Sequence, residues 1–196
     1  MLRVMKFVIQ TRDLGLKLQI SQPFKYSKEA NKTIIWYLKA YSDASYASDK
    51  DNCLSVTGFI VYFMGAPISW RSRLQRQISL SSTESEYYAI SDVVRELMYI
   101  RNILRSLGIE VGLPIQVYVD NLGAIFMAKN AASSVRTKHV DTHFHFIRDY
   151  YKNGTLLVTF CNTVNMDADI LSKNVTSPIY DKHTPKLLGK PGYSEV

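Results

Sequence analysis

Tyr41-Ser42-Asp43-Ala44-Ser45 ends a segment with a strong β-strand pattern and places a carboxylate at its end. The residues before it, from Thr33, are rich in β-branched and aromatic side chains. Alternation puts Tyr37 on the same side as Asp43, and Trp36 on the opposite side. Because both sides are largely apolar, we expect a central strand covered on both faces. Taken alone, Asp43 would be explained more simply as the first residue of a turn.

Composition restricts the classes of protein that fit the chain. It has 196 residues, of which 46% are hydrophobic, so we expect one compact globular domain with extensions. The net charge of +7 favours an anionic partner, nucleic acid before an acidic membrane. The two cysteines, Cys53 and Cys161, lack the spacing of a disulfide framework or a zinc knuckle. No apolar run is long enough to span a bilayer and no signal-peptide core is present, so we expect a soluble intracellular protein.

The first residues have the pattern of an extension. We expect a short helix over residues 1–11, a strand-like segment over 14–20 and a polar linker over 21–31. A helix this short, with no partner of its own, suggests the end of an upstream module. The chain is therefore expected to be part of a longer protein.

A hairpin follows the Asp43 segment. Residues 55–64 are apolar on both faces, as in an interior strand, and Gly65-Ala66-Pro67 predicts a turn into an antiparallel strand from Ile68. Arg71, Arg73 and Arg76 come next. They form either a solvated basic edge or a patch that contacts phosphates.

The longest predicted helix begins near Ser81 and ends at Gly108. Its apolar stripe runs from Ile90 along one side, and the same line extended one turn back reaches Glu86. A carboxylate in a buried stripe is costly unless a cation or hydrogen-bond donors compensate, whereas Glu84 falls on the solvent side. The alternative is that Glu86 only stabilises the first turn of the helix.

Further acids stand at the ends of predicted elements. Residues 115–119 form a strand that ends at Asp120, which is either a ligand or a helix cap. Residues 122–130 predict a short helix and 155–161 the last strand. Asn165 is expected to cap a final helix with Asp167 and Asp169 in its first turn, and nothing in the pattern distinguishes these two acids.

A helix is also expected over residues 135–153, with Arg136 and Lys138 as candidates for phosphate contact. His139 and His143 have the i, i+4 spacing of a zinc pair, but no third ligand is evident. From about Val175 the composition predicts a loosely held tail.

Eight short motifs, in this order, resemble the ribonuclease H domain of copia-type (Ty1-like) LTR retrotransposon Pol polyproteins. They are Tyr-Ser-Asp-Ala-Ser-Tyr-Ala-Ser-Asp (41–49), Ser-Val-Thr-Gly-Phe (55–59), Ile-Ser-Trp (68–70), Ser-Ser-Thr-Glu-Ser-Glu-Tyr-Tyr-Ala (81–89), Val-Asp-Asn (119–121), Arg-Thr-Lys-His-Val-Asp (136–141), His-Phe-Ile-Arg-Asp (145–149) and Ala-Asp-Ile-Leu-Ser-Lys (168–173). The resemblance implies an α/β ribonuclease H-like fold, a mixed five-stranded sheet with three antiparallel strands first and helices on both faces. It also implies three regions: 1–32, the end of the upstream reverse-transcriptase region and linker; 33–174, the ribonuclease H domain; and 175–196, a tail.

The resemblance further implies a catalytic and metal-binding set of Asp43, Glu86, Asp120 and Asp169. It therefore selects Glu86 over Glu84 and Asp169 over Asp167. All-oxygen ligands suit two Mg²⁺ or Mn²⁺ ions, and two ions can hydrolyse a phosphodiester to a 5′-phosphate and a 3′-hydroxyl.

The implied substrate is the RNA strand of an RNA/DNA hybrid. Candidate substrate contacts are Ser45, Asn121, Arg71, Arg73, Arg136, Lys138 and His139. The implied partners are the hybrid and the reverse-transcriptase domain of the same polyprotein, with no membrane and no small-molecule cofactor. The implied location is cytoplasmic, within virus-like particles, or nuclear.

Two other functions fit the same fold. One is a catalytically inactive domain that binds hybrid or braces the reverse transcriptase, although the acid set is intact. The other is an integrase-like DNA strand transferase, which usually has Glu as its last acid, whereas the order here is Asp, Glu, Asp, Asp. Many family members also carry a His in the loop before the last acid, but residues 162–165 have none. We hypothesise that His139 substitutes for it, and an unchanged turnover rate in His139→Ala would contradict this.

Overall fold

The computed structural model describes residue 9 and residues 12–16, 18–20, 25–26, 34–130 and 146–188. The predicted helix over residues 1–11 therefore lies outside the described residues, apart from Ile9. In the segment 14–20, Leu16 forms an isolated bridge with Leu188, and the other described residues there are not in a strand. β1 (Lys25–Tyr26) lies within the predicted linker and pairs with β2 (Ile34–Ile35), which belongs to the segment predicted as a strand from Thr33.

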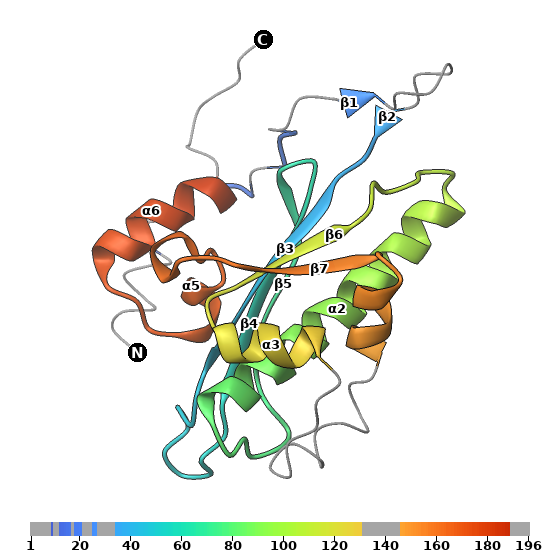
Figure 1. The fold of residues 1–196 in the computed structure, drawn as a ribbon. Coiled ribbons are helices and arrows are strands. Elements are labelled where there is room, and N and C mark those ends of the chain that lie inside the picture. Colours follow the sequence, from blue (N-terminus) through green and yellow to red (C-terminus); the bar gives the residue numbers. More distant parts are fainter. Residues whose placement is uncertain are drawn as a thin grey trace.

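A mixed five-stranded sheet forms the centre of the described residues (Figure 1). Its strands are β3 (Leu38–Ser45), β4 (Val56–Phe63), β5 (Ala66–Leu74), β6 (Ile115–Val119) and β7 (Leu156–Phe160). Their order is β5-β4-β3-β6-β7, with β3, β4 and β5 antiparallel and with β6 and β7 parallel to β3. This arrangement confirms the predicted α/β fold and the predicted hairpin, although the second strand of the hairpin begins at Ala66 and not at Ile68.

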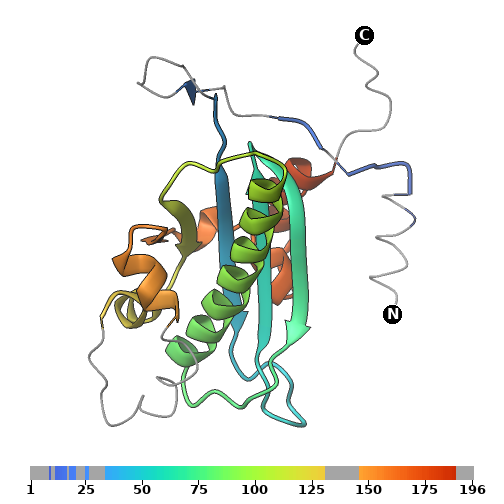
Figure 2. The same ribbon diagram turned by 90° about the vertical axis from the view of Figure 1, so that its right-hand side faces the viewer.

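Helices cover both faces of this sheet (Figure 2). α2 (Ser82–Ser106) packs along one face, with Ser81 as its N-cap. α3 (Leu122–Lys129) and the helical residues 146–152 lie near β6 and β7. The short 3₁₀ helix η1 (Thr163–Asn165), α5 (Asp169–Ser172) and α6 (Ser177–Leu187) follow β7. α5 and α6 lie on the face opposite α2 (Figure 2).

The hydrophobic core lies between α2 and the sheet. Its fully buried side chains include Phe59 and Val61 of β4, Ile90 and Leu97 of α2, and Val117 of β6. The predicted stripe of α2 is confirmed over its first half. Further along, Leu107 is exposed, because α2 extends past the edge of the core before Gly108 adopts a positive φ of 77°.

The other face of β3 is less completely covered than the sequence predicted. Tyr37, Lys39 and Tyr41 are only partly buried. The helix on this face, α5, has only four residues, and its backbone approaches the sheet closely at Gly58 of β4. Burial on that face is therefore greatest around Asp43 itself, which has no exposed surface.

Two expectations for the end of the chain were wrong. The last predicted helix begins at Asp169, and Asn165 belongs to η1 instead of capping it. The tail was expected to be loosely held, but α6 forms within it and buries His183 to 1% exposure. Within the described residues, none of the helices combines the length and the apolar composition that a bilayer crossing needs.

Candidate active site

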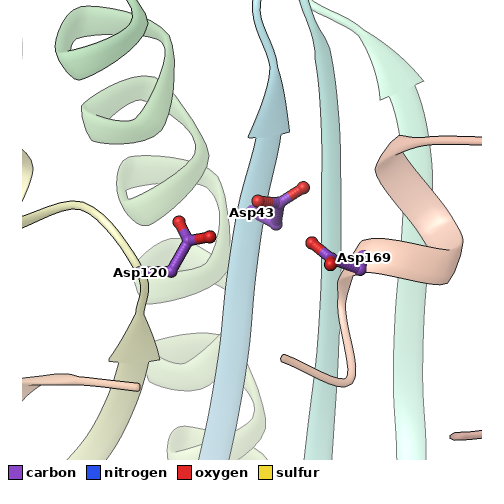
Figure 3. A group of neighbouring side chains, drawn as sticks. All are labelled: Asp43, Asp120 and Asp169. Carbon is purple, nitrogen blue, oxygen red and sulfur yellow. The ribbon is translucent and has the colours of Figure 1, made fainter. Parts of the chain in front are cut away.

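Three aspartates from distant parts of the sequence meet at the centre of the sheet (Figure 3). Asp43 lies in β3, Asp120 directly follows β6, and Asp169 is the first residue of α5. One carboxylate oxygen from each lies within 4.8 Å of the others. The structure therefore brings together three of the four acids that the sequence selected.

Glu86, the fourth acid, is the fifth residue of α2, just after its first turn, and is 5% exposed. Its pKa is raised to about 9, first by burial and then by the charges of Asp43 and Asp120, while the backbone N–H of Ala44 acts in the opposite direction. Its Oε2 atom has no hydrogen-bond partner within the described residues. Glu86 is thus a buried acid beside the aspartates, although it is not one of the three whose oxygens lie within 4.8 Å.

Glu84 was expected on the solvent side of α2, and this was wrong. It is 6% exposed, because the residues just before the helix fold back over it. Its carboxylate accepts hydrogen bonds from the Leu80 backbone N–H and the Tyr88 hydroxyl, both at 2.8 Å. Glu84 therefore stabilises the N-terminal end of α2 through these hydrogen bonds. Glu86 Oε2, in contrast, remains available to a ligand.

Lys173 holds two of the aspartates and was not singled out from the sequence. Its Nζ atom lies 3.0 Å from Asp43 Oδ1 and 2.9 Å from Asp169 Oδ1. Burial lowers the pKa of Lys173, but the two carboxylates outweigh this effect and the net pKa is raised. The i, i+4 spacing of Asp169 and Lys173 on a helix was the available signal.

Asp43 has a second neighbour in α5, because the Ser172 hydroxyl donates a hydrogen bond to Asp43 Oδ2. Burial raises the pKa of Asp43 to about 6, against the opposing effects of Lys173 and Ser172. Asp120 is partly exposed and accepts a hydrogen bond of 2.9 Å from Thr163 Oγ1 of η1. Asp43 is thus oriented by Ser172 and Lys173, at the end of α5, and Asp120 by Thr163 of η1. Asp169 is held by Lys173, at the end of its own helix.

Asp167 does not join the aspartates. It is 3% exposed and binds three side chains away from the site: the Tyr62 hydroxyl at 3.0 Å, His183 Nδ1 at 2.6 Å and Lys186 Nζ at 2.5 Å. His183 and Lys186 belong to α6. Asp167 therefore attaches α6 to the sheet, and Asp169, two residues later, faces the site.

The remaining predicted contacts occupy different positions. Ser45 ends β3 and is partly buried. Asn121 caps α3 by accepting the Ala124 backbone N–H at 3.0 Å. Arg136, Lys138, His139 and the candidate zinc pair of His139 with His143 lie outside the described residues.

Arg71 and Arg73 lie within β5, on the α2 side of the sheet. Arg73 is in register with Thr57 of β4, which pairs with Ala44, so its side chain lies on the face opposite Asp43. It binds Asp92 of α2 at 3.0 Å, and Arg71 lies 3.7 Å from Glu96. With Arg76 and Arg95 they line a hollow of about 390 Å³.

The chemistry of the acids fits a divalent cation. Carboxylate oxygens are the ligands that Mg²⁺ and Mn²⁺ prefer, and several carboxylates so close together cannot all ionise without positive charge. Glu86 Oε2, which is buried and has no hydrogen-bond partner among the described residues, is an independent observation that fits a cation at this site. The described residues therefore provide an acidic site that is compatible with divalent metal binding.

Comparison with known proteins identifies related sequences and a related fold. No family model matches the chain. The Pol polyprotein of transposon RE2 from Arabidopsis thaliana is 35% identical over 94% of the chain, and that of RE1 from the same plant is 37% identical over 76%. The polyprotein of transposon TNT 1-94 from Nicotiana tabacum is 39% identical over 70%. The chain spans only 10–12% of the length of these three relatives.

Among solved structures, LC11-RNase H1 in complex with an RNA/DNA hybrid aligns with a TM-score of 0.51. The alignment covers 68% of this chain and 92% of that one at 13% identity, so it bears on the fold alone. The chain therefore belongs with the retrovirus-related Pol polyproteins of copia-type transposons, as a domain with the ribonuclease H fold.

Proposed function

We propose that the chain is a metal-dependent endonuclease that hydrolyses the RNA strand of RNA/DNA hybrids during reverse transcription of a retrotransposon. The observation that carries this proposal is the meeting of Asp43, Asp120 and Asp169 within 4.8 Å, beside a buried glutamate. The homologous Pol polyproteins and the ribonuclease H fold support the same choice. A neighbour with this fold was solved with an RNA/DNA hybrid, which suggests the substrate class.

Asp43, Glu86, Asp120 and Asp169 would hold two Mg²⁺ or Mn²⁺ ions. Bound there, the ions would supply a nucleophile at neutral pH and stabilise the charge that develops on the phosphate and the leaving 3′ oxygen. Asp43, at the centre of the group, would be shared between them. Asp120 and Glu86 would serve the leaving-group side and Asp169 the water side. The products would be a 5′-phosphate and a 3′-hydroxyl.

The protein's other residues would position the hybrid. Ser45 and Asn121 are proposed to contact 2′-hydroxyl groups in the shallow minor groove, the feature that distinguishes RNA from DNA. The hollow lined by Arg71, Arg73, Arg76 and Arg95 contains four positive charges, and Asp92 and Glu96 supply two negative charges. The net charge of the hollow is therefore positive, which would favour contact with phosphates. Arg136, Lys138 and His139 are proposed to extend this contact, and the preceding reverse-transcriptase domain is the proposed partner. The proposed setting is a cytoplasmic virus-like particle or the nucleus.

A cleavage assay with a labelled RNA/DNA hybrid and Mg²⁺ tests the proposal. We expect the unmodified chain to shorten the RNA strand and Asp43→Asn to be at least about a thousandfold slower, because the central metal ligand loses its charge. Asp149→Asn, a change of the same type at an exposed residue, is the matched control and should cut normally. Metal-dependent cutting that persists in Asp43→Asn would contradict the assignment of the site.

A domain that only binds hybrid, or braces the reverse transcriptase, would release no metal-dependent products in the cleavage assay. It would still retain the hybrid in a gel-shift experiment. The two measurements together therefore separate the two functions without a further variant.

A further inference from the structure

The ion pairs of Lys173 run to the two most deeply buried aspartates of the site. The side chains of Asp43 and Asp169 are 0% and 4% exposed, whereas that of Lys173 is 35% exposed. Among the described residues, the ion pairs of both aspartates run to this single ammonium group. Lys173 therefore neutralises part of a negative cluster that burial would otherwise make unstable.

The ammonium group contacts carboxylate oxygens of two residues that could also bind a metal ion. It contacts Oδ1 of Asp43 and Oδ1 of Asp169, while Oδ2 of Asp43 already accepts the Ser172 hydroxyl. A Mg²⁺ ion would lie about 2.1 Å from each ligand oxygen. An ion and an ammonium group cannot both occupy the space between the same two oxygens.

We propose that Lys173 is an exchangeable counter-ion of the metal site. Its ammonium group lies between Asp43 and Asp169 while no divalent ion is bound, and it moves toward solvent when an ion takes that position. The long, flexible stem of lysine and its partial exposure permit this movement. The inference rests on the metal site of the proposed function. It adds that the Lys173 ammonium group competes with the divalent ion for Asp43 and Asp169.

Two substitutions separate charge from packing. Lys173→Met keeps an unbranched apolar stem and removes the charge, whereas Lys173→Arg keeps the charge. Ion binding is measured on the full chain without nucleic acid, by calorimetric titration with Mg²⁺ and with Mn²⁺. Thermal unfolding is followed in EDTA on the same samples. Lys152→Met, at an exposed lysine on the helical residues 146–152, is the matched control.

Lys173→Met is expected to bind the ion roughly tenfold more tightly than the unmodified chain, because the competing charge is gone. In EDTA it should unfold at a lower temperature, and saturating Mg²⁺ should close the difference. Lys173→Arg should stay near the unmodified chain in both measurements, and Lys152→Met should change neither.

The possible results distinguish this inference from the proposed function. Equal or weaker ion binding by Lys173→Met overturns the counter-ion role but leaves the metal site intact. If neither the unmodified chain nor Lys173→Met binds an ion, the inference and the metal site both fail. Tighter binding in Lys173→Met supports both.

A second measurement uses the unmodified chain and covers the case in which Lys173→Met does not fold. Amine acylation is mapped by mass spectrometry with and without Mg²⁺. Release of the ammonium group predicts that labelling of Lys173 rises on adding Mg²⁺, while labelling of Lys152 stays constant. Unchanged labelling of Lys173 at saturating Mg²⁺ would show that the ammonium group remains in place, and would overturn the inference.

Discussion

Glu86 gives the site a pH dependence that can be measured without substrate. In the folded, metal-free protein its pKa is about 9, against an ordinary value of 4.5. A raised carboxyl pKa contributes stability that is fully present below pH 4.5 and is lost progressively as the pH rises toward 9. Asp43 contributes with the same sign, but only up to about pH 6. Between pH 6.5 and 8.5, Glu86 therefore contributes more than Asp43 to the pH dependence of the free energy of unfolding.

We expect the free energy of unfolding in EDTA to fall between pH 6.5 and pH 8.5, as measured by urea denaturation. Glu86→Gln should flatten this fall, because the amide cannot ionise. Glu84→Gln is the matched comparison, because Glu84 is a buried glutamate of the same helix that accepts two hydrogen bonds. An equally steep fall in Glu86→Gln would show that another group causes the dependence.

At the scale of single residues, the sequence was informative wherever a motif or a helix face identified one acid. The apolar stripe of α2 correctly placed Glu86 in a buried position. It failed for Glu84, because the loop that buries Glu84 is not part of the helical periodicity. Asp167 and Asp169 could not be separated by pattern at all, since their roles depend on α6 in one case and on β3 in the other.

At the scale of elements, the position of α5 depends on the close approach of two backbones. A Cβ atom added to Gly58 of β4 would lie 2.7 Å from the Ser172 backbone nitrogen and 2.9 Å from the Ala168 carbonyl oxygen. Both neighbours are backbone atoms, so they cannot rotate away as a flexible side chain would. Glycine at this position therefore lets α5 bring Asp169 up to Asp43.

We expect Gly58→Ala to destabilise the protein by about 1–3 kcal/mol, because α5 must shift to make room. The same shift should weaken Mg²⁺ binding, which calorimetry on the folded variant would detect. Gly15→Ala, where nothing lies within 4 Å of the added atom, should do neither. Normal Mg²⁺ affinity in Gly58→Ala would indicate that α5 does not need this contact to present Asp169.

Elements with a clear periodicity were predicted well, and elements defined by distant contacts were not. The apolar run of β4 predicted an interior strand, and its residues from Thr57 to Tyr62 are buried. The four-residue α5 is too short to show a period, and its start at Asp169 is set by packing against β4. The helix α6 was missed because its composition, with Pro178 and Pro185, resembles that of a linker.

At the scale of the whole molecule, α6 raises the question of where the domain ends. The sequence predicted a boundary at residue 174, yet Asp167 accepts hydrogen bonds from two residues of α6, His183 and Lys186. Removing α6 would leave a buried carboxylate with the Tyr62 hydroxyl as its remaining partner among the contacts described above. We therefore propose that the stable unit extends to the end of α6.

We expect a chain that ends at Asn174 to lose roughly 3 kcal/mol of unfolding free energy, because the carboxylate of Asp167, which is 3% exposed, loses its hydrogen bonds to His183 and Lys186. Urea denaturation of the two lengths measures this difference. A chain that ends at Leu188 keeps α6 and should match the full chain. Equal stability of all three lengths would support the boundary at residue 174.

The central pairing of the sheet has a consequence for how a bound ion and the protein would affect each other. Within the described sheet, β3 and β6 are paired only from Lys39–Gln116 to Tyr41–Tyr118. Asp43 and Asp120 stand just beyond this short pairing, and Asp169 is held against the β3 side by Lys173 and Ser172. An ion bound by all three would act as a cross-link between the two halves of the domain. Loss of the ion would then weaken the contact between the two halves along the β3–β6 pairing. The same ion would therefore support both catalysis and the rigidity of the fold.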